Sequence, residues 1–231
     1  MILSAGWVLL TAINVTSSTS RRDGLQALAM FVRTSSSRVE ASFAITARYS
    51  VTMAQFQHLP ELWLLSDERN DAGLEEALVR MPRGSGFVYR HYHLNDPDRR
   101  ARFQSLKRMC RALDHVVILA DSALTAREWG ANGIYGAPRA LYPTRRDLLN
   151  IAIAHDLREI GQANRAQADA VMLSPAFATN SHPGATSLGP NRFQMLAKRA
   201  EMPVIALGGM NQRTADRLNW PLWAAIDGLS L

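Results

Sequence analysis

Eight short apolar segments, each bounded by turn residues and with helical patterns between them, constrain the fold of this 231-residue chain more than any other feature. Continuous apolar runs such as VVIL and PVIAL are typical of strands covered on both faces, as in a parallel sheet. We expect strands within residues 61–68, 86–94, 115–121, 132–136, 150–155, 169–177, 202–210 and 222–229. Helical patterns cover residues 71–81, 96–113, 122–131, 144–150, 156–167, 191–200 and 211–219.

Eight strand–helix units favour a closed (β/α)8 TIM barrel over an open doubly wound sheet. A dinucleotide-binding fold is disfavoured because no G-x-G-x-x-G follows the first strand. The longest helical pattern is expected to be capped by Asp96, with Pro97 at its first position. The pattern stops at the eighth strand, so we expect the last helix to be missing or replaced by the helical segment 24–33.

Residues 1–58 differ from the rest, and we expect them to be an extension that is disordered or not translated, ahead of a barrel domain at 59–231. The chain begins with an apolar run of fifteen residues, too short to span a bilayer as a normal helix. The run lacks the basic n-region of a signal peptide, although a cryptic export signal stays open as the alternative. We therefore expect no membrane partner and a cytoplasmic location.

Arginine carries almost all of the positive charge behind the net charge of +6, and arginine suits phosphate and carboxylate recognition. An anionic ligand is therefore expected. The charges come in scattered pairs, Arg99-Arg100 and Arg145-Arg146 among them, which we interpret as solvated helix faces and not as a nucleic-acid stripe. The lone cysteine, Cys110, excludes an intramolecular disulfide and a cysteine-rich zinc site, and its helical context predicts a small buried side chain.

Ligand groups in such a barrel lie where the strands end, and phosphate sites favour the loops after the seventh and eighth strands. Gly208 and Gly209 follow PVIAL, and Gly228 follows the last strand, so we expect a phosphate there. Tight turns are the structural alternative for these glycines. The long hydroxyl-rich loop SPAFATNSHPGATSLGP, in which Thr179 and its neighbours can donate hydrogen bonds, is expected to close on the ligand.

This loop, together with MPVIALGGM, resembles the sixth-strand loop and seventh strand of thiamine phosphate synthases and the related thiazole tautomerases. Synthases typically carry G-P-V-F-x-T-x-T-K there, and SPAFATNSH keeps Pro175, Phe177 and Thr179. Ser181 replaces the second threonine and His182 replaces the lysine. The resemblance implies that Thr179, Ser181 and His182 bind a substrate phosphate.

The resemblance extends over residues 60–231. LWLLSDE is similar to the family's first strand, and FVYRHYH matches its second strand at Arg90, where the family has Q-L-R-x-K. IAIAHDLREI resembles the S-x-H segment and keeps His155, with Ile153 in place of the serine. The implied catalytic residues are Arg90, which would neutralise pyrophosphate, and His155, a candidate proton shuttle.

The family also binds magnesium pyrophosphate through an Asn-Asp pair after the third strand and another aspartate after the fourth. Here the pair reads Ala120-Asp121, and GAPRA supplies no second carboxylate. The resemblance thus implies Mg²⁺ held by Asp121 alone, beside Arg90, with pyrophosphate oxygens and waters completing the shell.

The predicted function is that of a thiamine phosphate synthase, which joins a hydroxymethylpyrimidine pyrophosphate to a thiazole phosphate and releases pyrophosphate. Two alternatives stay open: a thiazole tautomerase-like isomerase, and a barrel that binds a phosphorylated ligand without catalysis. The expected partners are phosphorylated heterocycles, and the sequence leaves the oligomeric state open.

Overall fold

The computed structural model of the chain describes residues 59–179, 186–227 and 229. All of these belong to the unit that spans residues 48–231. The expected N-terminal extension, with its helical segment 24–33, lies outside the described residues. Within the described ranges, no helix is both long enough and apolar enough to cross a membrane.

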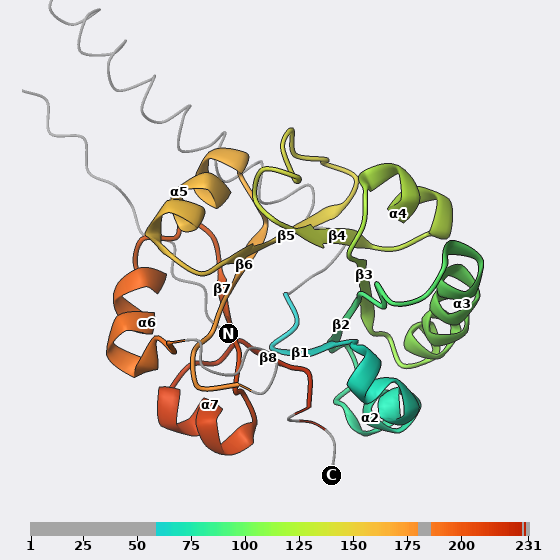
Figure 1. Cartoon of the computed structure of the whole chain (residues 1–231), viewed down its shortest axis with the longest axis horizontal. Coiled ribbons are helices and arrows are strands. Elements are labelled where there is room, and N and C mark those ends of the chain that lie inside the picture. Colours follow the sequence, from blue (N-terminus) through green and yellow to red (C-terminus); the bar gives the residue numbers. More distant parts are fainter. Residues whose placement is uncertain (1–58, 180–185, 228, 230–231) are drawn as a thin grey trace, which may run out of the picture. The chain divides into compact units, whose positions relative to one another are not determined.

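Eight parallel strands form a closed barrel in which each strand pairs with its neighbours in sequence and β8 pairs with β1 (Figure 1). Leu62 lies opposite Trp223 where the ring closes. The TIM-barrel prediction is confirmed. The strands are β1 (Leu62–Leu65), β2 (Gly86–Tyr89), β3 (Val116–Leu119), β4 (Gly133–Gly136), β5 (Leu149–Ala154), β6 (Ala170–Leu173), β7 (Val204–Leu207) and β8 (Trp223–Ala225).

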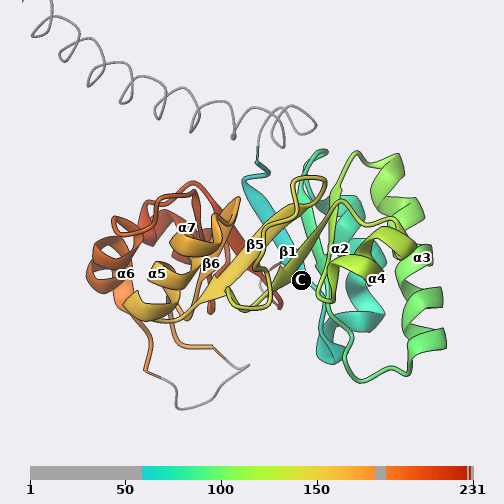
Figure 2. The same cartoon turned by 90° about the horizontal axis from the view of Figure 1, so that it is seen from above.

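The helices lie outside this ring, with α3 and α4 on one side of the strands and α5 and α6 on the other (Figures 1 and 2). In the described part of the chain, β8 is the last regular element. The helices are the 3-10 helix η1 (Glu68–Gly73), α2 (Leu74–Arg80), α3 (Asp96–Ala112), α4 (Ala123–Trp129), α5 (Leu157–Ala166), α6 (Gly189–Ala197) and α7 (Gln212–Leu218).

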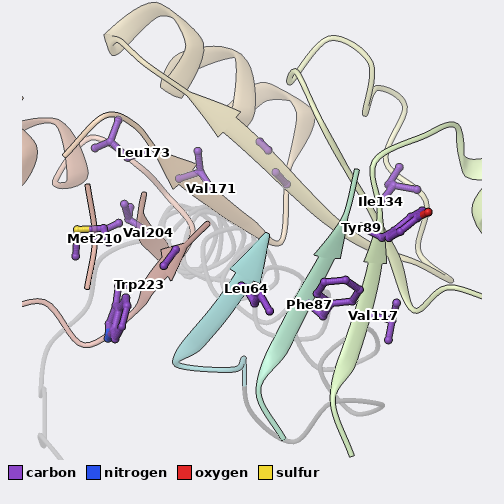
Figure 3. Close-up of a cluster of buried hydrophobic side chains, with 14 of the residues drawn as sticks. Leu64, Phe87, Tyr89, Val117, Ile134, Val171, Leu173, Val204, Met210 and Trp223 are labelled. Atoms are coloured by element: carbon purple, nitrogen blue, oxygen red, sulfur yellow. The ribbon is translucent and has the colours of Figure 1, made fainter. Parts of the chain in front are cut away.

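Alternation along the strands produces two buried clusters. Trp63, Leu65 and Val88 belong to a cluster made of strand side chains, which fills the barrel interior. Leu64 and Phe87, one residue away, belong to the cluster that also contains helix residues and therefore lies between the ring and the helices (Figure 3). The near-continuous apolar strands of the sequence thus follow from burial on both faces.

Two local expectations were wrong. No helix forms within 144–150, because the strand already begins at Leu149 and the Asn150 amide donates to the carbonyls of Arg145 and Leu148 at 2.8 and 2.6 Å. Asp96 does not cap α3: Asn95 does, accepting the Asp98 N–H at 3.0 Å. Cys110 is fully buried in α3, as predicted.

Gly86 makes room for the Trp63 ring inside the barrel. A Cβ at Gly86 would lie 2.1 Å from Cε3 of Trp63, and the two residues lie opposite each other in the paired strands β1 and β2. We expect Gly86→Ala to lower the free energy of unfolding by about 1–3 kcal/mol through overpacking, measured by urea denaturation. Gly73→Ala is the matched control, because a Cβ there meets nothing within 4 Å, so its effect should stay within about 0.5 kcal/mol. Equal stability of the two variants would contradict this packing.

Candidate functional site at the carboxyl ends of the strands

Three polar side chains extend the inner face of the barrel at its mouth, which is the opening at the carboxyl ends of the strands. Val88 belongs to the inner cluster, so Arg90, two residues further along, extends the same face. Tyr135 of β4 is itself a member of the inner cluster. Ile153 packs against that cluster and His155 follows it after β5. Arg90, Tyr135 and His155 are therefore the groups that a ligand in the mouth would meet.

Arg90 is held by the end of β1. Its Nε donates to the Ser66 carbonyl at 2.8 Å and its Nη2 donates to Asp67 Oδ2 at 2.9 Å. Asp67 has a second cationic partner, because Arg69 Nε donates to its Oδ1 at 2.7 Å. Burial would raise the pKa of Asp67, but the hydrogen bonds from Arg69 and the charges of Arg69 and Arg90 hold that pKa below its usual value. The guanidinium of Arg90 thus faces an ionised carboxylate.

A buried hydrogen-bonded chain fixes the backbone that follows Arg90. His91, almost fully buried and at φ 39°, lies 2.8 Å from Ser66 Oγ through Nδ1 and 2.7 Å from Asp71 Oδ1 through Nε2. Burial lowers the pKa of His91, although Asp71 opposes this effect. In the neutral ring, Nε2–H donates to Asp71 and Nδ1 accepts from the Ser66 hydroxyl. Ser66 Oγ in turn accepts the Arg90 N–H at 2.8 Å, so this chain holds Arg90 in place.

Asp121, the predicted magnesium ligand, has an arginine partner other than the expected Arg90. Its Oδ2 accepts from Arg99 Nη1 at 2.5 Å, and its Oδ1 accepts the Ser122 N–H at 2.6 Å. Burial would raise the pKa of Asp121, but the hydrogen bonds from Arg99 and Ser122 lower it below its usual value. The interpretation of Arg99 as part of a solvated face was wrong, because only 6% of this residue is exposed.

The residues around Asp121 do not form a ligand set for magnesium. Across the described ranges, there is no group of three or more His, Cys, Asp or Glu side chains that could hold a metal ion. Mg²⁺ prefers several oxygen ligands in octahedral geometry, and both oxygens of Asp121 already accept hydrogen bonds. The next strand ends in Tyr135 and Gly136, which supply no carboxylate.

His155 lies at the mouth with about half of its side chain exposed, at 52%. Its Nδ1 lies 2.8 Å from Glu159 Oε2, and the same oxygen accepts the His155 backbone N–H at 2.7 Å. Because a carboxylate only accepts, Nδ1 carries a proton and Nε2 is the nitrogen that can meet a ligand. This orientation suits a proton shuttle.

Gly208 and Gly209 have positive φ values of 92° and 61° and contact the segment after β6. A Cβ at Gly208 would lie 2.7 Å from Pro175 Cα, and one at Gly209 would lie 2.3 Å from the Ala178 carbonyl oxygen. The Gly208 carbonyl also accepts the Phe177 N–H at 3.0 Å. The two glycines therefore let the base of the β6 loop approach β7 closely, which supports the tight-turn reading and brings Thr179 near β7.

Three other predicted ligand residues cannot be placed: Ser181, His182 and Gly228 lie outside the described residues. A hollow of about 550 Å³ lies away from all of the predicted site residues, between the β4–β5 connection and α5. It is lined by Pro138, Arg139, Tyr142, Gln162, Arg165 and Ala166.

Sequence reasoning missed the residues that support the mouth from outside. Arg99 shares a helical stripe with Phe103, Leu106 and Cys110, at the spacing of one buried face, and this pattern was the available signal for its burial. The contact between His91 and Asp71 joins the end of β2 to η1, and nothing in their local sequence indicates it.

Comparison with known proteins gives a consistent family assignment. The thiamine monophosphate synthase family model matches residues 64–220. A thiamine-phosphate synthase of Methanobrevibacter smithii is 33% identical over 78 residues, which cover 34% of this chain and 36% of that protein. One from Nitrosococcus oceani is 27% identical over 154 residues, covering 64% of this chain and 71% of that protein. The chain spans only about a third of the first of these relatives.

Solved structures agree with the fold. A thiamine phosphate pyrophosphorylase from Pyrococcus furiosus superimposes with a TM-score of 0.60 at 21% identity, covering 73% of this chain and 86% of that one. FabK from Thermotoga maritima has the same TM-score at 14% identity, covering 77% of this chain and 61% of that one. Structural likeness at such identities shows the barrel alone, whereas the family model covers most of the barrel sequence. The chain belongs to the thiamine monophosphate synthase family.

Proposed function

We propose that this chain is a thiamine phosphate synthase-type transferase, which joins a hydroxymethylpyrimidine pyrophosphate to a thiazole phosphate. The observation that carries the proposal is the family match over residues 64–220. At the mouth of this barrel, Arg90 and His155 occupy positions that extend the inner face. Relatives named thiamine-phosphate synthase support the same reaction.

In the proposed reaction, the bond between the pyrimidine methylene carbon and the pyrophosphate oxygen breaks, and the electron pair leaves with pyrophosphate. The thiazole nitrogen then donates its lone pair to the methylene carbocation and forms the carbon–nitrogen bond. The protein's task is to orient two rings and to stabilise the departing negative charge. Arg90, preorganised by Ser66 and by the His91 chain, is the residue we assign to that charge.

The thiazole phosphate is assigned to the β6 and β7 ends. Thr179, with Ser181 and His182 further along the loop, would donate hydrogen bonds to it, and Gly208, Gly209 and Gly228 would allow the close approach. The support for this assignment is that the base of the loop is fixed to β7 through the Phe177 N–H and the Gly208 carbonyl. An oxyanion held there would lie within the ring of strand ends.

A thiazole tautomerase-like isomerase is the second candidate, and two contacts favour it. Asp121 is already paired with Arg99, and His155 is oriented by Glu159 with Nε2 available for proton transfer. An isomerase needs one phosphate site and one proton shuttle. An assay with the substrates of the transferase and, separately, of the isomerase therefore distinguishes the two candidates.

Arg90→Gln should lower the rate of pyrophosphate release by about 10²–10³-fold, because it removes charge stabilisation where pyrophosphate departs. The assay supplies both substrates and magnesium and follows released pyrophosphate. Arg83→Gln is the matched control: Arg83 forms an exposed ion pair with Asp114 before β2 begins, so its loss should leave the rate unchanged. If the parent protein releases no pyrophosphate from these substrates, the transferase proposal fails.

His155→Gln separates the two enzymatic candidates. Loss of a proton shuttle typically costs about 10²–10⁴-fold, so an isomerase should lose turnover of the thiazole phosphate by that factor. A transferase, whose bond-forming step moves no proton, should lose far less in the pyrophosphate assay. Glu159→Gln serves as the companion variant, because it keeps the helix position and weakens only the orientation of the ring.

Gly209→Ala should weaken binding of thiazole phosphate by roughly 10-fold or more, because its Cβ would push the Ala178 carbonyl, and with it the base of the β6 loop, out of position. Gly84→Ala is the control for backbone strain. Gly84 also has a positive φ, at 79°, but a Cβ there meets nothing within 4 Å. Calorimetric titration of both variants measures the effect. Equal affinities in the two variants would place the phosphate away from the β6–β7 contact.

A further inference from the structure

The guanidinium of Arg99 is bonded through all three of its nitrogens. Nη1 donates to Asp121, Nε donates to the Arg90 carbonyl at 2.9 Å, and Nη2 donates to the Ala120 carbonyl at 3.0 Å. The side chain thus joins α3 to the residues that follow β2 and β3. Displacing it would leave two carbonyls and a carboxylate without their donor, in a place where Arg99 itself is 6% exposed.

Three aromatic rings lie close to the guanidinium of Arg99. Its central carbon lies 6.0 Å from the ring centroid of Tyr89, 5.7 Å from that of Tyr92 and 5.5 Å from that of Trp129. These distances allow cation–π attraction, which adds to the hydrogen bonds in fixing the charge. Tyr89 also donates its hydroxyl to the Arg99 carbonyl at 2.9 Å, so backbone and side chain are both tied to β2.

The direction of Asp121 agrees with this arrangement. Ala120 belongs to the inner cluster, and Asp121 follows it at a bend before α4. There Oδ2 of Asp121 meets the guanidinium of Arg99 of α3. A divalent cation at this carboxylate would lie beside a buried guanidinium that has no room to withdraw, and like charges at such a distance repel strongly.

We propose that the cation bound by Asp121 is the guanidinium of Arg99, and that Asp121 does not bind a divalent metal ion. In this assignment, Asp121 is a positioning residue: it anchors the guanidinium whose Nε fixes the carbonyl of Arg90. Taken with the proposed function, on which this step rests, the pyrophosphate departs without a metal ion at Asp121. The proposal departs from what the family resemblance implies for this aspartate.

Metal binding by the full chain, free of substrates, is the direct test. Electron paramagnetic resonance of Mn²⁺ added to the protein should show no tightly bound ion, with the same result for Asp121→Asn. Stoichiometric Mn²⁺ that is bound by the parent and lost in Asp121→Asn would overturn the proposal. This measurement needs no active enzyme, so its outcome is separate from that of the pyrophosphate assay.

A double-mutant cycle in EDTA tests the pair itself. Asp121→Asn and Arg99→Gln should each lower Tm by roughly 5–10 °C, because the first leaves the buried Arg99 guanidinium without its carboxylate and the second removes the donor of three hydrogen bonds. The double variant should be as stable as the less stable of the two single variants, because either single change already removes the interaction between the two side chains. Additive losses would contradict the assignment. Arg100→Gln is the control on the same helix: Arg100 pairs with Glu128 at the surface, and its loss should hardly change Tm.

Ligand affinity completes the test. Adding magnesium should change the Kd for inorganic pyrophosphate by the same factor, within about twofold, in the parent and in Asp121→Asn, and a tenfold gain with magnesium that disappears in Asp121→Asn would contradict the proposal. If pyrophosphate binds under neither condition, the proposed function fails, while the Mn²⁺ measurement still decides the role of Asp121.

Discussion

The hydrogen bonds between β1 and β8 close the sheet, and closure leaves each strand side chain only two directions, into the barrel or toward the helices. Trp63 takes the first direction and fills the space that Gly86 leaves open. Past the strand ends, Arg90 continues the inner face of β2, because Val88 belongs to the inner cluster. Asp121, at the bend after β3, meets Arg99 of α3 instead. The ends of these two strands therefore separate a residue that can meet a ligand from one that supports it.

The supporting layer is polar, although it lies between apolar helices and apolar strands. His91 and Arg99 are both nearly fully buried there, and each has a carboxylate partner on another element: Asp71 and Asp121, respectively. The buried charge of Arg99 would be strongly destabilising without Asp121, and the neutral ring of His91 would lose a hydrogen bond without Asp71. Both residues are linked to the backbone of Arg90. His91 is linked through Ser66 Oγ, which accepts the Arg90 N–H, and Arg99 donates to the Arg90 carbonyl. Two separate networks thus fix the backbone of Arg90.

The repeat of strand and helix patterns was enough to predict the barrel, because burial on both faces of parallel strands leaves a clear apolar signal. The sequence predicts less about residues whose burial or contacts depend on partners that are distant along the chain. Arg99 was assigned to a solvated face because charge pairs usually are, and only its shared stripe with Phe103 indicated otherwise. The sequence predicts a phosphate site at the glycines after β7 but gives no sign of their second role, the close approach of the β6 loop that their φ values and contacts show. Such contacts follow from tertiary packing, which local sequence does not specify.

The ion pairs at the mouth also bear on how an anion would be recognised. Arg90 faces Asp67, so a phosphate must compete with that carboxylate for the guanidinium. The competition is feasible because Asp67 does not depend on Arg90 alone: Arg69 donates to Asp67 Oδ1 and also reaches Asp227 at 3.2 Å. If Arg90 turned toward a ligand, Arg69 would still hold Asp67 ionised, and no carboxylate would be left without a cation. Within the described part of the chain, the pair of Arg99 and Asp121 has no such second cation, since Arg99 is the cation that reaches Asp121. Of the two arginines, Arg90 is therefore suited to exchange a carboxylate for a phosphate, and Arg99 is suited to stay in place.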